Sequence, residues 1–547
     1  MISAARAWIA QDPDPETRDE LTALVKAAEA GGGDASSELA ARFAGRLQFG
    51  TAGLRGELGA GPMRMNRVLV AQAAAGFAAY LRERGGDNTP RVVIGFDGRK
   101  NSDVFARDSA ELFQGAGLEA ILLPRRLPTP VLAFAVRYLD ADAGVMVTAS
   151  HNPPADNGYK VYLGGADGGA QIVTPADADI AREIQHVADT LAVPDLPRST
   201  EYLVADEGVV EAYVAATAAV AAAPASASGM SWVYTAMHGV GWETLRAVVE
   251  AAGYPLPALV AAQTEPDGAF PTVAFPNPEE PGALDLAYET ATASGAEFII
   301  ANDPDADRVA VAIPSADGWR RLTGNDIGLL LGARAARSAG AGATVASSLV
   351  SSPGLGVIAE RFGVSWRETL TGFKWIARAP GIVFGYEEAL GYLVNPETVR
   401  DKDGISATVA VLGLVAEARG RGATIADLLD ELAAEFGHFT STQISVRVEN
   451  LSLISGAMES LRAEPPRSFG AMTVTVADDL LRPADGTPGG DILRYQLSDG
   501  ARVIFRPSGT EPKLKAYLDV RGESADIARA RLTALEAAVR AELAERM

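Results

Sequence analysis

Residues 92–117 read VVIGFDGRKNSDVFARDSAELFQGAG, which is a strand, a turn and a helix in immediate succession. Val92–Phe96 is the apolar, β-branched run of a buried strand, and Asp97–Arg99 forms the turn that ends it. Asn101 or Ser102 can cap the helix that follows, and a pair of glycines closes it. This succession predicts an α/β fold, in which helices cover a sheet.

The same succession returns along the chain. Strands that alternate with helices build parallel or mixed sheets, so we expect several α/β domains. Ligands of such domains usually bind on the loops beyond the strand ends. The further apolar strands are predicted at residues 120–123, 144–147, 298–301, 309–313 and 343–350.

The tail of the chain has a different pattern. Residues 441–448 alternate like a strand, residues 495–497 and 503–505 flank an Asp-Gly hairpin signal, and a helical stretch follows. This pattern predicts a small α+β domain. A chain of 547 residues makes three or four domains at roughly 150 residues each. With Gly- and Pro-rich segments as boundaries, the predicted domains are residues 1–200, 201–318, 319–438 and 439–547.

The composition limits the class of protein. Apolar residues make up 48% and charged residues 22%, which is ordinary for a soluble enzyme. The absence of cysteine excludes disulfides, thiol nucleophiles and thiolate zinc sites, and it suits a reducing cytoplasm, where we expect the protein to act. A net charge of −22 disfavours nucleic acid and membranes as partners. An anionic substrate would need basic residues gathered in a few loops.

One loop presents a serine. The predicted strand at 144–147 runs directly into Thr148, Ala149, Ser150 and His151, so the serine hydroxyl is held at the end of a rigid element. A hydrolase nucleophile elbow has glycines two residues to either side of the serine, which this loop lacks. Esterase chemistry is therefore disfavoured. An isolated Ser-His pair is otherwise typical of a turn or a helix cap.

Three aspartates follow one another at alternate positions between two apolar strands. Asp303, Asp305 and Asp307 cannot share a helix face, but in a turn they can converge on one hard cation. Without a cation, three crowded carboxylates would repel each other. An EF-hand is excluded because Arg308 and Pro314 occupy the places of its glycine and its last carboxylate. The set suits Mg²⁺, with a solvated acidic turn as the alternative.

Two further loops carry polar groups. Residues 385–392 read GYEEALGY, whose paired acids can accept hydrogen bonds from vicinal sugar hydroxyls, although an exposed turn is the alternative. Residues 506–513 read RPSGTEPK, whose amides, hydroxyls and guanidinium can cradle a phosphate, with an ordinary turn as the alternative. An acidic chain with bases in such loops is suited to a small anion. These bases are Arg55, Lys160, Arg308, Lys374, Arg506 and Lys513.

Together these loops resemble, in type and order, those of the α-D-phosphohexomutase superfamily, the phosphoglucomutases and phosphomannomutases. The resemblance implies an α/β protein with three related mixed α/β/α domains plus a smaller C-terminal α+β domain around a central cleft. It identifies Ser150 as the serine that carries the phosphoryl group. It implies an Mg²⁺ site formed by Ser150, Asp303, Asp305 and Asp307, and a sugar bisphosphate such as glucose 1,6-bisphosphate as activator.

Other matching segments imply further roles. Residues 49–56 resemble a loop in which Arg55 helps to hold phosphate, and Lys160 is a candidate general acid or base. Arg308 would supply positive charge at the serine, which His151 adjoins. The residues expected to bind the sugar and its phosphate are Thr371, Gly372, Lys374, Glu387, Glu388, Arg506, Ser508, Gly509, Thr510 and Lys513.

One position departs from the family pattern. Many hexose-specific members carry Glu-x-Ser in the sugar loop, whereas this chain has Ala389, a form similar to a branch with phosphopentomutases and bisphosphate-forming relatives. We predict a mutase that interconverts the 1-phosphate and 6-phosphate of glucose, mannose or both. The alternatives are a ribose phosphate mutase, a sugar-bisphosphate-forming phosphotransferase, a metal-dependent phosphatase and a non-enzymatic sensor. The expected partners are sugar phosphates, bound by a monomer or homodimer.

Overall fold

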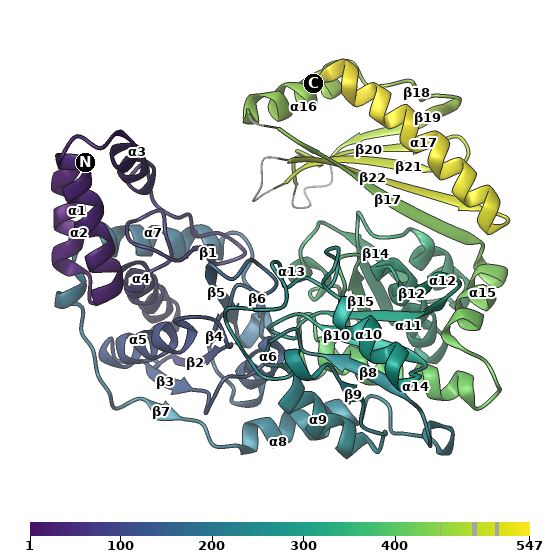
Figure 1. Cartoon of the computed structure of the whole chain (residues 1–547), viewed down its shortest axis with the longest axis horizontal. Coiled ribbons are helices and arrows are strands. Elements are labelled where there is room, and N and C mark those ends of the chain that lie inside the picture. Colours follow the sequence, from purple (N-terminus) through teal and green to yellow (C-terminus); the bar gives the residue numbers. More distant parts are fainter. Residues whose placement is uncertain (449, 484–488, 509–512) are drawn as a thin grey trace. The chain divides into compact units, whose positions relative to one another are not determined.

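The computed structural model describes residues 1–448, 450–483, 489–508 and 513–547 (Figure 1). The chain divides into two compact units. The first comprises Met1–Leu322 and Leu390–Gly422, and the second comprises Thr323–Ala389 and Ala423–Met547. Among the described residues, no helix has the length and apolar character needed to cross a membrane.

The first unit begins with a mixed sheet. Its strands are β1 (Leu54–Glu57), β2 (Arg91–Phe96), β3 (Glu119–Leu122), β4 (Ala143–Val147), β5 (Asp156–Leu163), β6 (Ala170–Gln171) and β7 (Leu203–Val204). Their order is β1-β5-β4-β2-β3-β7, with β6 beside β5. β2 pairs in parallel with β3 and β4, whereas β5 runs antiparallel to both β4 and β1. The expected strand, turn and helix at residues 92–117 are present.

A second mixed sheet completes the first unit. Its strands are β8 (Trp232–Thr235), β9 (Ala258–Leu259), β10 (Phe298–Asn302), β11 (Val309–Ser315) and β12 (Gly318–Arg321). β8 pairs in parallel with β9 and β10, and β11 runs antiparallel to β10 and to β12. The helices of this unit are α1 (Ile2–Gln11), α2 (Pro15–Glu29), α3 (Gly33–Arg42), α4 (Arg67–Gly85), α5 (Ser102–Gly115), α6 (Thr129–Tyr138), α7 (Ala176–Thr190), α8 (Gly208–Ala218), α9 (Gly241–Ala252), α10 (Asp285–Ser294) and α14 (Gly404–Arg419), and the short strand β16 (Gly391–Leu393) also lies in it.

The second unit repeats the same strand order. β13 (Thr344–Ser348) pairs in parallel with β14 (Ser365–Thr369) and with β15 (Ile382–Glu387). Each of the three sheets therefore contains three parallel strands, of which the first in the sequence lies between the other two. These strands are β2, β3 and β4, then β8, β9 and β10, then β13, β14 and β15. This shared order shows that the three α/β domains are related, as expected. The helices here are α11 (Gly324–Ser338), α12 (Gly354–Phe362), α13 (Phe373–Ile376) and α15 (Ile425–Phe436).

An antiparallel sheet forms the C-terminal part of the second unit. Its strands, in spatial order, are β17 (His438–Arg447), β22 (Lys513–Gly522), β21 (Arg502–Pro507), β20 (Leu493–Leu497), β19 (Met472–Asp479) and β18 (Ser468–Phe469), accompanied by the helices α16 (Leu451–Ala463) and α17 (Ala525–Arg546). Figure 1 shows α17 lying along one face of this sheet. Leu535 and Val539 of α17 are fully buried in one core with Val503 and Leu518 of the sheet. The expected α+β domain is confirmed.

Two details of the sequence analysis need comment. The predicted side-chain cap of α5 is not formed, because Asn101 has a left-handed backbone and the Ser102 hydroxyl donates instead to Asp97 Oδ1 at 2.7 Å. The domain boundaries at residues 200, 318 and 438 stay predictions, and so does the central cleft.

Two helices of the first domain lie very close together. Gly76 of α4 faces the backbone of α7, so that a Cβ atom at this position would lie 2.5 Å from the amide nitrogen of Ile184. No real Cβ makes such a contact, and one of the helices would have to shift. The glycine is therefore required by packing rather than by helix propensity.

We expect Gly76→Ala to destabilise the protein by about 1–3 kcal/mol through overpacking, although alanine is the better helix former. The matched control is Gly456 in α16, which is exposed and where an added Cβ meets nothing within 4 Å. Gly456→Ala should stabilise by up to about 1 kcal/mol. Thermal unfolding of the two variants should shift Tm in opposite directions. A Tm that rises for both would show that α7 moves aside.

Candidate active site

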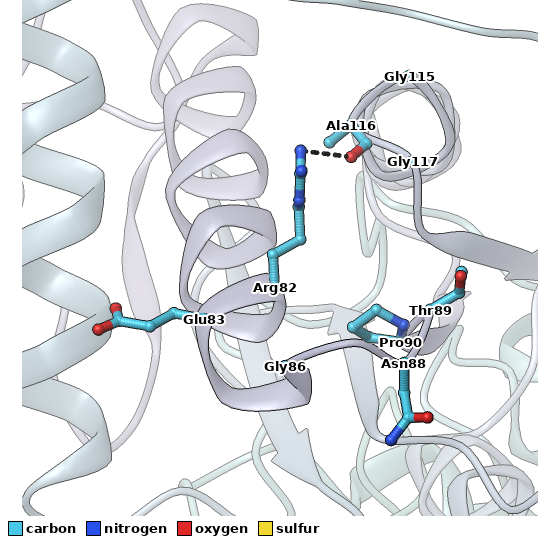
Figure 2. Close-up of a pocket in the computed structure, with 9 residues that line it drawn as sticks. All are labelled: Arg82, Glu83, Gly86, Asn88, Thr89, Pro90, Gly115, Ala116 and Gly117. Atoms are coloured by element: carbon cyan, nitrogen blue, oxygen red, sulfur yellow. Dashed lines mark hydrogen bonds between the residues drawn. The ribbon is translucent and has the colours of Figure 1, made fainter.

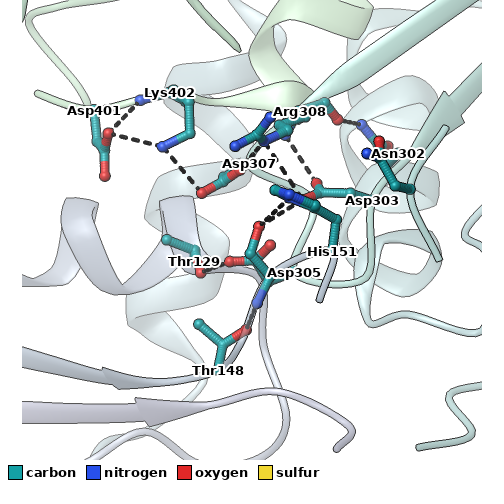
Figure 3. A network of polar contacts seen from close by, with 12 residues as sticks. Thr129, Thr148, His151, Asn302, Asp303, Asp305, Asp307, Arg308, Asp401 and Lys402 are labelled. Atoms are coloured by element: carbon teal, nitrogen blue, oxygen red, sulfur yellow. Dashed lines mark hydrogen bonds and ion pairs between the residues drawn. The ribbon is translucent and has the colours of Figure 1, made fainter. Parts of the chain in front are cut away.

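Three carboxylates converge in the turn between β10 and β11. Asp303, Asp305 and Asp307 are each 0% exposed, and one oxygen from each lies within 4.8 Å of the others. Ala306 closes the turn with a left-handed backbone, φ 54°. Figure 3 shows the convergence that the spacing predicts. The solvated acidic turn is wrong because the three carboxylates are buried.

Basic side chains from separate segments balance this cluster. Lys160 of β5 donates to Asp305 at 2.6 Å and to Asp307 at 2.8 Å. The ammonium of Lys402 lies 3.2 Å from the Asp307 carboxylate, and Nε of Arg308 lies 3.7 Å from it. Sequence reasoning did not identify Lys402. The signal that could have found it is the charged run at residues 401–403, which directly precedes the apolar helix α14.

The protonation states follow from this arrangement. Burial, together with the charges of Asp305 and Asp307, raises the pKa of Asp303 well above its ordinary value. Burial alone would also raise the pKa of Asp307, but Lys160, Lys402 and Arg308 outweigh it and hold that pKa below its ordinary range. The pKa values of these two neighbouring carboxyls are therefore shifted in opposite directions.

The cluster fits a hard divalent cation. Oδ1 of Asp305 and Oδ1 of Asp307 are buried and accept no hydrogen bond. Buried carboxylate oxygens without donors are costly unless a cation satisfies them. Oxygen ligands from carboxylates are also the ligands that Mg²⁺ prefers.

The serine identified from the sequence lies beside these carboxylates. Ser150 is 2% exposed, and its hydroxyl donates to Oδ2 of Asp303 at 2.9 Å. Its backbone is left-handed, φ 52°, and its amide donates to the Thr148 hydroxyl at 2.8 Å. Nδ1 of His151 lies 3.2 Å from the serine oxygen. Burial, followed by the charges of Arg308 and Arg55, lowers the pKa of His151 well below its ordinary value, so this imidazole is neutral.

Arg55 also lies close to the serine loop. It comes from β1, whose register places it opposite Gly158 of β5, the strand that carries Lys160. Its guanidinium donates to the side-chain oxygen of Asn152 at 3.3 Å. The structure thus brings Arg55 to the serine loop. A hydroxyl held among carboxylates, ammonium groups and guanidinium groups is suited to phosphoryl transfer, which needs positioning and charge neutralisation.

The other predicted residues lie in the second unit. The Gly372 amide donates to Oε1 of Glu387 at 2.7 Å, which ties the loop at residues 371–374 to the end of β15. Oε2 of Glu388 accepts from the hydroxyls of Ser348 and Ser351, both at 3.0 Å. Burial, together with the charge of Glu387, raises the pKa of Glu388. The two acids therefore have different surroundings, and Glu388 is held by protein hydroxyls.

The segment at the end of β21 lies near these acids. Arg506 interacts with Tyr517 of β22, and the charges of Glu388 and Glu387 act on the same tyrosine, whose pKa is raised mainly by burial. The Ser508 amide donates to the Lys513 carbonyl at 2.8 Å, which joins the described residues on either side of 509–512. Gly509 and Thr510 lie outside the described residues. Thr371 and Lys374 are partly buried, beside Gly372.

The predicted site residues are thus divided between the units. Ser150, His151, Lys160, Arg55, Arg308 and the three aspartates belong to the first, and the described residues predicted to bind sugar and phosphate belong to the second. A separate hollow of about 540 Å³ lies near the C-terminal ends of α4 and α5, where Arg82 donates to the Ala116 carbonyl (Figure 2). Its lining contains none of the described residues that were predicted for the site.

Comparison with known proteins agrees with this geometry. Family models described as phosphoglucomutase/phosphomannomutase, alpha/beta/alpha domains I, II and III, match residues 46–190, 211–316 and 323–436. The chain is 56% identical over 463 residues to the "probable phosphomannomutase" of Haemophilus influenzae, covering 84% of this chain and 94% of that protein. It is 34% identical over 575 residues to the "probable phosphoribomutase" of Schizosaccharomyces pombe, covering 98% of this chain and 96% of that one.

A solved structure shares the fold. A phosphoglucomutase/phosphomannomutase family protein from Burkholderia thailandensis aligns with a TM-score of 0.69 at 22% identity, covering 90% of this chain and 97% of the other. The fold thus consists of three α/β/α domains and a C-terminal α+β domain. With all three domain models matched in order and a serine held at its buried aspartates, the chain belongs to the phosphoglucomutase/phosphomannomutase family and is a phosphotransferase of that type, an isomerase.

Proposed function

We propose that this enzyme interconverts the 1-phosphate and 6-phosphate of a hexose, glucose or mannose or both, with Ser150 as the phosphoryl carrier. The observation that carries the proposal is the 2.9 Å hydrogen bond from the Ser150 hydroxyl to Asp303 within the buried aspartate cluster. Arg55 and Arg308 lie close enough to the serine loop for their charges to act on His151, and such charges would help to neutralise a phosphoryl group. The serine is also sheltered from water, which protects a phosphoserine from hydrolysis.

Asp303, Asp305, Asp307 and an oxygen of phosphorylated Ser150 would hold Mg²⁺. When bound, the ion would supply positive charge at the phosphoryl oxygens. The charges of the site support this reading. The three carboxylates face three cationic side chains, Lys160, Lys402 and Arg308, so that the charges of the group nearly cancel. A phosphoserine of about −2 and one divalent cation would keep that balance.

Different residues of the chain would then have different roles in phosphoryl transfer. The bond between phosphorus and Oγ of Ser150 breaks as a sugar hydroxyl bonds to the phosphorus, and that hydroxyl gives up its proton. Neutral His151, 3.2 Å from Oγ, can accept a proton at Nδ1. Lys160 is held as an ammonium by Asp305 and Asp307, which outweigh the effect of burial on its pKa, so it can donate a proton or stabilise charge. Arg55 and Arg308 add positive charge around the serine.

The sugar and its second phosphate would be bound by the second unit. Glu387 would accept hydrogen bonds from ring hydroxyls, with the loop at residues 371–374 beside it, and the segment starting at Arg506 would grip the phosphate that does not react. The bisphosphate formed in the first transfer would return its other phosphate to Ser150. A sugar bisphosphate such as glucose 1,6-bisphosphate would also phosphorylate the resting enzyme.

A hexose is favoured by the 56% identity to a protein named phosphomannomutase, against 34% to one named phosphoribomutase. The second candidate is a pentose phosphate mutase. Ala389 favours it, because alanine stands where many hexose enzymes have serine. We expect the enzyme in a reducing cytoplasm, since the chain contains no cysteine.

Ser150→Ala should abolish mutase turnover, since no other described hydroxyl contacts Asp303. Labelled glucose 1,6-bisphosphate should label the wild type at Ser150 and leave the variant unlabelled. The matched control is Ser109→Ala, which removes another buried serine hydroxyl, one that donates to the Phe105 carbonyl within α5. Near-normal turnover of Ser150→Ala would refute the proposal that Ser150 carries the phosphoryl group. Net release of inorganic phosphate by the wild type would indicate a phosphatase instead.

Asp305→Asn should raise the Mg²⁺ concentration needed for half-maximal turnover by at least about tenfold, because one carboxylate charge is lost from the ligand set. A magnesium titration of activity checks this. Asp108→Asn is the control, since Asp108 is a buried carboxylate that pairs with Arg67 and Arg198 and does not belong to the cluster. Full activity of the wild type in excess chelator would contradict the metal site.

Glu387→Ala should lower kcat/KM for every sugar phosphate by roughly tenfold or more, because a partly buried hydrogen-bond acceptor for hydroxyls is lost. Glu387→Gln retains an oxygen that can accept from the Gly372 amide, so its kcat/KM should fall less than that of Glu387→Ala. Parallel kinetics on glucose, mannose and ribose 1-phosphates measure the preference. Ala389→Ser should shift it towards glucose phosphates. A wild-type efficiency for the pentose roughly ten times that for the hexoses would replace the hexose with the pentose.

A further inference from the structure

We propose that Arg99 is a positioning residue for phosphoryl transfer, which fixes the conformation of the serine loop, residues 150–156, and so holds Ser150 Oγ at Asp303. The inference rests on the proposed role of Ser150. In the sequence, Arg99 is only the last residue of a turn, Asp97-Gly98-Arg99, that follows β2.

The guanidinium of Arg99 donates to four carbonyl groups of the serine loop. Nη2 donates to the carbonyl oxygens of Ser150 and Asn152, both at 2.6 Å. Nη1 donates to those of Pro153 at 2.9 Å and Asp156 at 3.1 Å. The arginine side chain is 0% exposed, so these bonds do not compete with water. One side chain therefore determines where four of the seven loop carbonyls point.

The arginine is itself held from three sides. Its amide donates to Oδ1 of Asp97 at 3.0 Å, and its Nε lies 3.6 Å from Oδ2 of the same carboxylate. Its guanidinium carbon lies 4.9 Å from the centre of the Phe270 ring. Gly268 packs so closely on this turn that a Cβ there would lie 2.9 Å from the Lys100 amide nitrogen. A guanidinium enclosed in this way cannot follow the loop if the loop moves.

The loop conformation needs such a device. Ser150 is a non-glycine residue with φ 52°, a conformation that a free chain rarely adopts. Its carbonyl is bound by Arg99 while its hydroxyl is bound by Asp303, so the arginine and the aspartate fix the two ends of the same residue. Lysine could not replace the arginine, because an ammonium is a point charge and lacks the planar fork of five donors.

The test compares Arg99→Ala and Arg99→Lys with the wild type. A displacement of the serine by about 1 Å should lower kcat about 100-fold in Arg99→Ala. KM for the sugar phosphate should stay within about threefold, because Arg99 is not a binding group. Arg99→Lys retains the charge opposite Asp97 and should fold, yet its kcat should also be low. Full turnover of Arg99→Lys, or a rise in KM with unchanged kcat, would overturn the proposal.

The matched control is Arg67→Ala. Arg67 makes two hydrogen bonds to Asp108, at 2.7 and 2.8 Å, within the same domain, and neither involves the serine loop. Its loss should lower Tm while leaving kcat within about threefold of the wild type. If both arginine variants lose kcat in proportion to their loss of Tm, Arg99 has only a structural role and the proposal fails.

Chemical rescue provides a readout that a general loss of stability would not give. Arg99 and Pro154 are among the residues that line a surface hollow of about 560 Å³, so removal of the side chain in Arg99→Ala would leave a space next to this hollow. Guanidinium chloride well below denaturing concentrations should restore part of kcat in Arg99→Ala, whereas ammonium chloride should not. Equal effects of the two salts would count against the proposal.

Labelling separates this proposal from the proposed function. Wild-type enzyme incubated with labelled glucose 1,6-bisphosphate must form labelled Ser150, and failure to do so refutes the mutase rather than Arg99. The other outcome concerns Arg99 alone. If the wild type is labelled and turns over, and Arg99→Ala gains and loses the label at the wild-type rates, only the positioning role is refuted.

Discussion

The rest of the site depends on three carboxylates buried together. Asp303, Asp305 and Asp307 are fully buried in one turn, where their repulsion is costly unless cations offset it. The cations at hand are Lys160 from the first sheet, Lys402 from the segment before α14, and Arg308 from the turn itself. The need for charge balance therefore ties segments more than 200 residues apart in the sequence to one point. The same balance is what the proposed function requires, since a phosphoserine and a divalent cation together add little net charge.

The repetition of the domains explains where the chemistry lies. In each α/β domain, the turn after the third parallel strand contains a non-glycine residue with a left-handed backbone: Ser150 after β4, Ala306 after β10 and Leu390 after β15. These turns are the serine loop, the aspartate turn and the loop of Glu387. The corresponding turn of the three domains thus contains different side chains in each domain. Backbones strained in this way are typical of functional sites.

The sequence was informative wherever the signal is local. Apolar runs at residues 92–96 and 144–147 predicted strands that the structure contains, and the alternate aspartates predicted their own convergence. It was uninformative wherever a role depends on distant partners. Arg99 read as a turn residue because its four carbonyl acceptors lie more than 50 residues away, and Lys402 stood among charges that a solvated loop would also show. The left-handed backbones of Ser150, Ala306 and Leu390 have no sequence signal, because these residue types rarely adopt that conformation.

Two buried arginines show why the guanidinium is used to fix these loops. Arg502 donates to Asp519, Glu368 and the Ser351 carbonyl, and the two carboxylates outweigh burial and raise its pKa. Arg99 donates to four carbonyls and lies beside the carboxylate of Asp97; burial outweighs the charges of Asp97 and the more distant aspartates, and its pKa is lowered. All four hydrogen bonds of the Arg99 guanidinium go to loop carbonyls, which are in place only in the native loop. A left-handed Ser150 costs about 1–3 kcal/mol, whereas an unsatisfied buried charge costs several kcal/mol. The loop conformation that strains the serine is thus the one that satisfies the arginine, and the second effect is the larger.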